Sequence, residues 1–431
     1  MLRARAIRVV LDLGLIVLAN ALTLVACASL VGVEDVKLRK ADAANPNIDD
    51  PGVVDEDVTT IEDGGGPPTG PNVLEVALGL QHTCARTPAG VVKCWGDNNH
   101  DQSGPADGDG GLLVTPQPVG ISDARHVAAG QYHTCAVRTS GKVSCWGENT
   151  DGQIGNGDTS GARVPIPADV KGLNDAVGVA CGASFSCALR TSGGVVCWGN
   201  GLGGQLGNGT KQLQPTPVAV TGLTTAVAVS AGESHACAVR NDGKVVCWGD
   251  NVNGQLGTGD KLERTTPAVT ISLDGMALVA AAARSTCAAK ASGGVFCWGA
   301  NEVGQLGSGA ANAMPNPSPT AVSGLDAIAL WAGSAHACAV RRGGTVACWG
   351  AGYQGQIGDG QTRAAASTPT PVPTAVSGIT NAIGVGTGGN HSCATTATGN
   401  ILCWGDNTHG ENGNGGAGDQ QLSPESVVGY P

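Results

Sequence analysis

Short apolar runs, each bounded by glycine and polar residues, recur through most of this 431-residue chain. Within residues 127–157, small apolar residues at Val127–Gly130 precede a second run at Thr134–Arg138 and a third at Lys142–Trp146. The tripeptide Thr-Ser-Gly at residues 139–141 separates the last two runs and is a typical tight-turn sequence. The pattern predicts three antiparallel strands, of which the last two form a hairpin.

A fourth apolar segment follows a longer polar loop and contains prolines. Examples are Pro116–Val119, Pro215–Val218 and Pro371–Val372. Proline lacks a backbone N–H, so a strand tolerates it at the outer edge of a sheet, where one side needs no donor. The pattern therefore predicts units of four strands with this strand outermost. The 69 glycines and 22 prolines of the chain are too many for a helical protein.

The four-strand unit occurs seven times. A cysteine, nine further residues and the tripeptide Cys-Trp-Gly appear once in each unit, and consecutive tryptophans are 50 to 55 residues apart. Such a period indicates repeated supersecondary units that bury their faces against one another. The prediction is an all-β, seven-bladed β-propeller over residues 72–431. Seven of the eight tryptophans occupy the repeat position and are predicted core residues: Trp95, Trp146, Trp198, Trp248, Trp298, Trp349 and Trp404.

The paired cysteines predict one cross-strand disulfide in each blade. A hairpin that turns about Ser140 places one cysteine opposite the other, and opposed residues of antiparallel strands are close enough for a disulfide. Zinc sites use two to four residues between cysteines, so a spacing of nine does not fit a metal site. Cys181 is left over and is predicted to be buried and inert. The pairs are Cys84–Cys94, Cys135–Cys145, Cys187–Cys197, Cys237–Cys247, Cys287–Cys297, Cys338–Cys348 and Cys393–Cys403.

The N-terminal residues 1–27 resemble an export signal, because three arginines precede a mostly apolar run. The run ends in Leu-Val-Ala-Cys, which resembles a bacterial lipobox and predicts lipid attachment at Cys27. Ordinary signal-peptidase cleavage after Ala28 and an uncleaved membrane anchor are the alternatives, although the run is short for a membrane span. Residues 28–71 contain ten acidic and three basic residues, and we expect them to form a disordered tether.

Charge and cysteine content narrow the class of protein. The formal net charge is −11, and residues 72–431 carry −6 of it without a basic stripe. Nucleic acid is recognised largely by neutralising phosphates, so these residues argue against it as a partner. Sixteen cysteines favour an oxidising compartment, in agreement with an export signal.

The tract Trp-Gly-x-Asn-x-x-Gly-Gln-Leu-Gly-x-Gly at residues 248–259 resembles the regulator of chromosome condensation repeat family. Close copies stand at residues 146–157, 198–209, 298–309 and 349–360. The preceding Gly-x-x-His sequence also matches, and its histidines are His82, His133, His235, His336 and His391. The resemblance covers about residues 72–431 and implies a seven-bladed propeller with a partner-binding face.

The chain departs from the family pattern in three respects. Phe185 and Ser285 replace the histidine in the third and fifth units. The first and seventh units lose the Gly-Gln-Leu-Gly core of the tract. Paired cysteines are not a feature of the nuclear members, which indicates an exported branch. We interpret the repeated histidines as parts of local hydrogen-bond networks, with a ring of binding histidines as the alternative.

These observations favour a non-enzymatic binding module at the cell envelope, anchored through an N-terminal lipid alone. Its partner is expected to be a protein or a polysaccharide, and the chain is expected to be monomeric. A secreted enzyme inhibitor and a polysaccharide lyase or hydrolase are the alternatives, and the nuclear members imply nucleotide exchange on a GTPase as a third. The candidate binding residues follow the repeated glycine: Gln131, Tyr132, Glu233, Ser234, Ala283, Arg284 and Asn390.

Cofactor, metal and catalytic motifs are weak or missing in the sequence. The Gly-Gln-Leu-Gly tracts lack the Gly-Lys-Ser/Thr of a phosphate loop. Acidic glycine-rich loops with Asp107, Asp109 and Asp419 lie in the first and seventh units, which touch in a closed ring. Their carboxylates are weak candidates for calcium ligands, and solvated loops are the alternative. We expect no cofactor and assign no catalytic residue.

Overall fold

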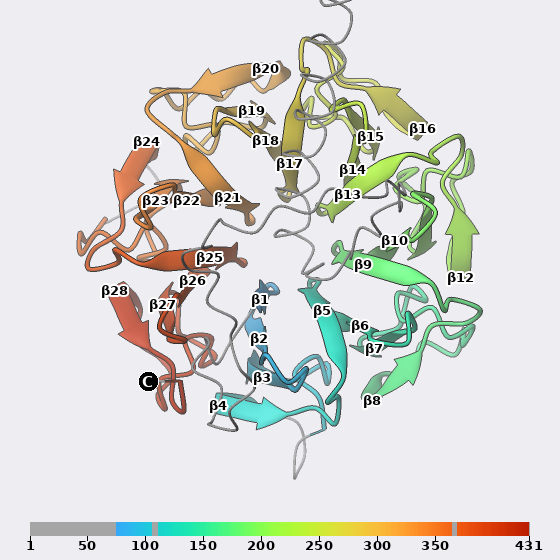
Figure 1. The fold of residues 1–431 in the computed structure, drawn as a ribbon, viewed down its shortest axis with the longest axis horizontal. Helices are drawn as coiled ribbons and strands as arrows, with labels where there is room; N and C mark the ends of the chain where they lie inside the picture. Colours follow the sequence, from blue (N-terminus) through green and yellow to red (C-terminus); the bar gives the residue numbers. More distant parts are fainter. Residues whose placement is uncertain (1–74, 106–110, 364–368, 431) are drawn as a thin grey trace, which may run out of the picture.

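The strands are arranged as seven four-stranded antiparallel sheets around a central axis (Figure 1). The computed structural model describes residues 75–105, 111–363 and 369–430. The predicted signal and tether, including Cys27, lie outside these residues, as do Asp107 and Asp109. The predicted all-β, seven-bladed propeller is confirmed for the described part of the chain.

Each blade consists of four strands that are consecutive in the sequence. Blades 1 to 3 contain β1 (Glu75–Leu78), β2 (His82–Arg86), β3 (Val92–Asp97), β4 (Leu112–Pro118), β5 (Ala124–Ala129), β6 (His133–Arg138), β7 (Val143–Gly147), β8 (Val164–Asp169), β9 (Ala176–Cys181), β10 (Phe185–Arg190), β11 (Val195–Gly199) and β12 (Gln214–Ala219). Blades 4 and 5 contain β13 (Ala226–Ala231), β14 (His235–Arg240), β15 (Val245–Gly249), β16 (Arg264–Val269), β17 (Met276–Ala281), β18 (Ser285–Lys290), β19 (Val295–Gly299) and β20 (Asn316–Val322). Blades 6 and 7 contain β21 (Ala327–Ala332), β22 (His336–Arg341), β23 (Val346–Gly350), β24 (Thr370–Ala375), β25 (Ala382–Thr387), β26 (His391–Thr396), β27 (Ile401–Gly405) and β28 (Gln421–Ser426).

The cysteine pairs join the second and third strands of every blade, as predicted. Cys135 of β6 is directly opposite Cys145 of β7, and the same register recurs in the other six blades. Their Cα atoms are 4.0 to 4.1 Å apart. All seven disulfides close loops inside single blades, so none of them joins one blade to the next.

The repeated tryptophans fasten neighbouring blades. Each of their side chains is fully buried, and each indole N–H donates to a backbone carbonyl of the preceding blade. Trp198 of blade 3, for example, donates to the carbonyl of Gln153 at 2.8 Å. Gly155 in that tract has a φ of 76°, and a Cβ atom there would lie 2.6 Å from the indole nitrogen of Trp198. The glycine is therefore required both for the turn and for the close approach of the next blade.

The ring closes without an exchange of strands between its ends. β1 is the inner strand of blade 1 and packs beside β25 and β26 of blade 7, whose outermost strand is β28 (Figure 1). The seam between blades 7 and 1 thus depends on side chains and loops. The inner strand of blade 2 begins earlier than the sequence predicted. The apolar run started at Val127, whereas β5 starts at Ala124, opposite Arg138.

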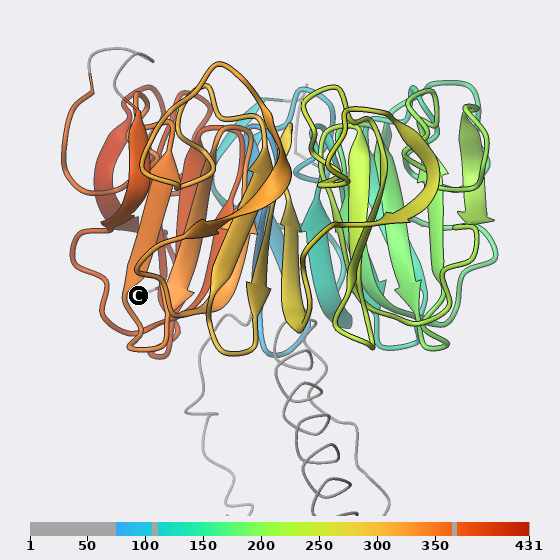
Figure 2. The same ribbon diagram turned by 90° about the horizontal axis from the view of Figure 1, so that it is seen from above.

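The two faces of the disc carry different connections (Figure 2). The loop face carries the turns between the first and second strands of each blade and the long loops between the third and fourth. The hairpin face carries the hairpin turns between the second and third strands and the connections between blades. Among the described residues, no helix has the length and apolar character to cross a membrane.

Candidate functional site

The seven inner strands surround a central channel with a cavity of about 580 Å³. Alanine, glycine and valine make up most of its lining. Trp331 of β21 is the one tryptophan in this lining: it stands opposite Cys338, a position where β5 has Ala128 and β25 has Gly386. It is the one tryptophan of the chain that does not occupy the repeat position, and this departure from the repeat could have identified it in the sequence.

The candidate binding residues all lie on the loop face, but only some of them line the mouth of the channel. Gln131, Glu233, Ala283 and Arg284 do so. Glu233 and Arg284 come from neighbouring blades and form an exposed ion pair, with 3.6 Å between guanidinium nitrogen and carboxylate oxygen. Tyr132, Ser234 and Asn390 are partly buried and lie away from the lining. Their role in binding stays a prediction.

Tyr132 connects two blades at the rim of the loop face. Its ring stacks on His100 of the β3–β4 loop, with 4.3 Å between ring centroids. A ring nitrogen of His100 also lies 3.9 Å from a carboxylate oxygen of Glu148 in blade 2. Tyr132 therefore has an aromatic partner within the protein.

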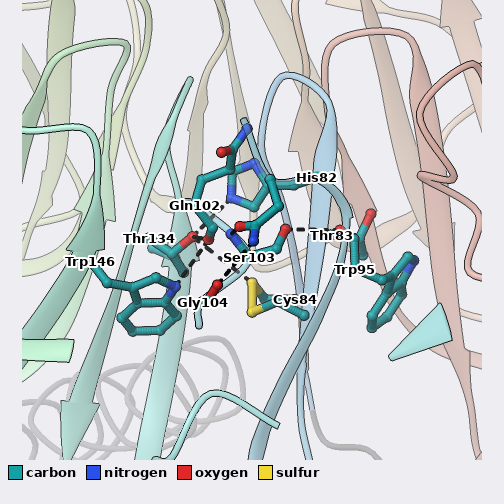
Figure 3. The surroundings of a disulfide bond; sticks show 12 residues. His82, Thr83, Cys84, Trp95, Gln102, Ser103, Gly104, Thr134 and Trp146 are labelled. Carbon is teal, nitrogen blue, oxygen red and sulfur yellow. Dashed lines mark hydrogen bonds between the residues drawn. A yellow bond between two sulfur atoms is a disulfide. The ribbon is translucent and has the colours of Figure 1, made fainter. Parts of the chain in front are cut away.

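The repeated histidines are buried and bond to the next blade, as Figure 3 shows for His82 and Thr134. Nε2 of His82 is 2.8 Å from the hydroxyl of Thr134 in blade 2. That hydroxyl donates in turn to the carbonyl of Gln102, which also accepts the indole N–H of Trp146. A carbonyl cannot donate, so the histidine carries its proton on Nε2 and donates to the hydroxyl. The prediction of structural histidines is confirmed.

The same bond occurs wherever a histidine is present. The five histidines bond to a threonine or serine one blade further round the ring: His82–Thr134, His133–Ser186, His235–Thr286, His336–Ser392 and His391–Thr83. In blade 3, where Phe185 replaces histidine, the residue at the hydroxyl position of blade 4 is Ala236. In blade 5, where Ser285 replaces histidine, it is Ala337. Donor and acceptor are therefore present together or absent together.

The glycine of the Gly-x-x-His sequence makes room for the imidazole ring. A Cβ atom on Gly130 would lie 2.3 Å from Cε1 of His133, and one on Gly232 would lie 2.5 Å from Cε1 of His235. Blade 5 has Ala282 in place of this glycine, and it also has the small Ser285 in place of the ring. The repeated motif is thus a packing unit.

Burial keeps these groups chemically inert. Loss of hydration lowers the pKa of His82, His133, His235 and His336 to about 3 and that of His391 to about 4. Burial also raises the pKa of the Cys181 thiol to about 12. A neutral, enclosed thiol is a poor nucleophile, which agrees with the predicted inert role.

Charge is divided unequally between the two faces. In the described connections, each taken with the strand residues at its two ends, the loop face has six lysines and arginines against fourteen acidic residues. The hairpin face has ten against six. The described loop-face connections are therefore rich in acidic residues, of which Asp97 and Glu411 are buried.

The acidic residues of the loop face gather on three adjacent blades. We call the described loop-face connections of blades 7, 1 and 2 the acidic sector. It contains one basic residue, Arg163, and eight acidic residues: Asp97, Asp101, Glu148, Asp151, Asp158, Asp406, Glu411 and Asp419. On blades 3 to 6, four of the five basic residues are paired with acids: Lys211–Glu263, Arg264–Asp260, Arg284–Glu233 and Arg363–Asp359.

Exposed apolar side chains lie beside the acidic sector, on the loops of blades 3 to 5. Leu202 and Val252 occupy the same position in neighbouring loops and are 61% and 64% exposed. Leu213, Leu262 and Met314 are also exposed on these loops. The loop face thus combines an acidic part with an apolar part. The sequence did not reveal this arrangement, because the residues that form each part are far apart in the chain.

Few of the described residues are arranged as metal ligands. His133, Cys135 and Cys181 have ligand atoms within 4.8 Å of one another, but Cys135 is bonded to Cys145 and offers no thiolate. Asp419 is exposed in the loop between β27 and β28, and its proposed partners Asp107 and Asp109 lie outside the described residues. Calcium binding there stays an untested prediction.

Comparisons with known proteins agree on one family. A family model for the RCC1-like domain matches residues 61–274 and 167–430. The human E3 ubiquitin-protein ligase HERC2 is 30% identical over 158 residues, which cover 34% of this chain and 3% of that protein. The ultraviolet-B receptor UVR8 of Arabidopsis thaliana is 34% identical over 154 residues, which cover 34% of each chain. The chain therefore matches a third or less of the length of these relatives.

Solved structures with the same fold include human WBSCR16, with a TM-score of 0.70, 24% identity and coverage of 79% of this chain and 96% of that one. Yeast RCC1 (Prp20) bound to Kap60 has a TM-score of 0.68 and 20% identity over 87% of this chain and 91% of that one. At these identities the likeness shows the fold alone. Prp20p of Saccharomyces cerevisiae has also been studied for its binding to Gsp1p and histones.

Proposed function

The chain belongs to the RCC1-like domain family, whose fold is a protein-interaction scaffold, and on that premise we propose that it is a non-enzymatic binding module whose loop face contacts a partner protein. The observation that supports this proposal is the composition of that face. A rigid ring holds an acidic sector beside exposed apolar side chains, whereas its repeated polar groups are buried. Charge complementarity and apolar contact are the two terms that a protein interface combines.

The partner surface that fits this face is basic with an apolar component. The acidic sector has no lysine or arginine paired with Glu148 or Asp151 among the described residues, so these carboxylates are available to a partner. Leu202 and Val252 on the neighbouring loops would be covered by the same partner. An enzyme inhibitor would be one example of such a module.

We place this module outside the reducing cytosol. Seven disulfides fit an oxidising environment, and their presence in every blade supports export. Attachment of a lipid at Cys27 is the most specific form of this proposal. Mass spectrometry of the mature chain tests it, since an acylated N-terminal cysteine adds the mass of its lipid, and a mature N-terminus elsewhere would contradict it.

Chemical crosslinking tests the binding face. The oxidised chain is incubated with the envelope and secreted fractions of its source, crosslinked with a carbodiimide that joins carboxylates to lysines, and analysed by mass spectrometry. We expect crosslinks from the acidic sector to lysines of a defined partner, and we expect Glu148→Lys with Asp151→Lys to abolish them.

The control for this experiment changes the same charge on the other face. Asp274→Lys with Asp326→Lys replaces two exposed acids near the hairpin face and should leave capture intact. Capture that responds to the control pair and not to the Glu148 and Asp151 pair would contradict the proposed face. Leu202→Ser with Val252→Ser is expected to weaken binding at high salt, where charge attraction is screened.

A further inference from the structure

The seam between blades 7 and 1 differs in chemistry from the other seams of the ring. In five blades the tract that packs against the next blade contains glutamine followed by leucine or isoleucine, as at Gln255–Leu256. Blade 1 has Gln102–Ser103, and blade 7 has Glu411–Asn412. Blade 7 therefore replaces both the amide and the apolar side chain at the place where the ring closes.

Glu411 stands where the tract fastens blade 1. Its backbone carbonyl accepts the hydroxyl of Thr83 at 3.0 Å and the indole N–H of Trp95 at 2.7 Å. Its side chain is 1% exposed, and one carboxylate oxygen accepts the backbone N–H of His409 at 2.8 Å. A glutamine oxygen accepts the corresponding N–H in the other six blades.

The second oxygen of Glu411 cannot do what the glutamine amide does. In blade 4, the amide of Gln255 donates to the carboxylate of Asp250 at 2.8 Å. Asp406 occupies the Asp250 position in blade 7, and its negative charge opposes ionisation of Glu411. Burial and this repulsion raise the pKa of Glu411 to about 7.

His409 contacts polar groups of both blades at this seam. Its Nδ1 is 3.1 Å from Oε1 of Glu411 and 3.2 Å from the amide nitrogen of Gln81 in blade 1. If Nδ1 is unprotonated, its single lone pair accepts either from the amide of Gln81 or from a protonated Glu411. If Nδ1 is protonated, it donates to an ionised Glu411 and loses the amide of Gln81 as a donor.

Asn412 weakens the same seam by a different route. Its side chain is fully buried, yet neither its amide nitrogen nor its amide oxygen has a hydrogen-bond partner among the described residues. A buried amide without a partner destabilises a structure, whereas the leucine or isoleucine at this position in five other blades packs favourably.

We propose that the ring opens at the seam between blades 7 and 1, and that a proton on the buried Glu411 carboxyl favours the closed ring. Loss of this proton adds a buried negative charge, opposed by that of Asp406, to the residue whose carbonyl holds Thr83 and Trp95. The seam divides the acidic sector, so its opening would separate loops that face a partner. The inference goes beyond the proposed function because it holds with or without a partner.

One other ionisable group at this seam titrates in the opposite sense. His391 donates to Thr83, interacts with Asp406, and must stay neutral while the seam is closed. Acid therefore opens the seam through His391 and closes it through Glu411. The groups of blade 1 that contact the cluster, Gln81, Thr83 and Trp95, carry no charge. Comparing wild type with Glu411→Gln at each pH isolates the effect of the Glu411 carboxyl on seam opening, since both proteins contain His391.

Hydrogen–deuterium exchange of the full, disulfide-paired chain tests the proposal. We follow peptides from β2 and from residues 406–413 in the wild type and in Glu411→Gln between pH 5.5 and pH 8. With a pKa of about 7 in the closed ring and an ordinary value in the open one, the wild-type to variant ratio of exchange rates should rise roughly 30-fold over this range. A ratio that does not change with pH would overturn the proton-linked part.

Two further variants provide matched controls. Asn412→Leu should slow exchange at the seam equally at every pH, because it adds apolar packing without changing a titrating group. Gln255→Glu places a carboxyl opposite Asp250 and should create the same pH dependence at the seam between blades 4 and 5. Equal exchange at both seams of the wild type would overturn the assignment of the opening point. A partner that fails to bind would bear on the proposed function alone.

Discussion

At the residue scale, five histidines show how a polar side chain can be part of a core. Each imidazole is buried, neutral and bonded to a hydroxyl of the next blade, which itself bonds to a backbone carbonyl. Such a chain satisfies the hydroxyl and the Nε2 proton together. Blades 3 and 5 reach a packed seam differently, with Phe185 facing Ala236 and Ser285 facing Ala337.

The histidine–hydroxyl pair and the Phe–Ala pair predict that changes at the two positions of a pair have strongly coupled effects on stability. Thr286→Ala alone leaves the Nε2 proton of His235 buried without an acceptor, and we expect a loss of about 1–3 kcal/mol of unfolding free energy. His235→Phe together with Thr286→Ala reproduces the pair found at blades 3 and 4. The double variant should therefore be more stable than the sum of the single changes by about 1 kcal/mol or more.

Chemical denaturation of the four proteins of this cycle measures the coupling. The reverse change at a seam that lacks the bond provides the control: Ala236→Thr in blade 4 introduces a hydroxyl at the seam with Phe185 and should not stabilise the ring. Additive effects at His235 and Thr286 would show that the hydrogen bond contributes nothing beyond packing.

The histidine pairing also shows what could not be predicted from the sequence at this scale. The spacing of His82 within its own unit indicated a local network, and the residue is indeed buried. Its acceptor, Thr134, is 52 residues away and becomes a neighbour only when two blades pack together. The sequence shows that Ala236 and Ala337 replace the threonine or serine of the other blades. That these replacements accompany the loss of a histidine in the preceding blade is explained only by the contact between blades.

At the element scale, the hairpin of β6 and β7 explains why the cysteine pattern was informative. Alternating side chains and a tight turn determine which residues are opposed, so the distance of ten positions between Cys135 and Cys145 predicts both register and disulfide. The start of β5 at Ala124 was less predictable, because the polar residues Arg125 and His126 interrupt the apolar pattern on which a strand starting at Val127 was predicted.

The hairpin disulfides are expected to stabilise each blade by restricting the unfolded chain. Cys237→Ala with Cys247→Ala should cost roughly 2–3 kcal/mol in the chain-entropy model, because the bond closes a loop of ten residues. Denaturation without reductant measures this loss. Cys181→Ala is the control, since this buried thiol is unpaired and most other inner strands have alanine at its position. Equal losses in both variants would show that packing of the sulfur atoms, and not the crosslink, matters.

At the scale of the whole molecule, the ring separates structure from recognition. Its buried surfaces repeat in every blade, whereas the charges and apolar residues of the loop face do not. The repeat predicted the number of blades and their strands. It could not predict the acidic sector, because the loops of blades 7 and 1 come to adjacent positions only through ring closure, and the chemistry of that closure depends on Glu411 and Asn412.

The buried groups together predict how the stability of the ring depends on pH. An unfolded chain protonates its histidines below pH 6.5, but the five buried histidines, with pKa values of about 3 to 4, remain neutral in the folded ring. Their contribution is complete above pH 6.5 and is lost as the pH falls toward 3. Glu411, with a pKa of about 7, contributes fully below pH 4.5 and less as the pH rises through 7.

Acid lowers the stability of the ring through five histidines and raises it through Glu411 alone, so we expect acid to unfold the ring. Replacing His235 by Phe and Thr286 by Ala removes one of the five proton acceptors, so the midpoint of acid unfolding should move to lower pH relative to stability at neutral pH. Tryptophan fluorescence during a pH titration measures this midpoint, because the seven repeated indoles are buried only in the closed ring. Thr286→Ala alone keeps the imidazole and is the control. The double variant can be compared with a protein that has the same stability at neutral pH and retains all five histidines. If both unfold at the same acidic pH, then groups other than these imidazoles determine the midpoint of acid unfolding.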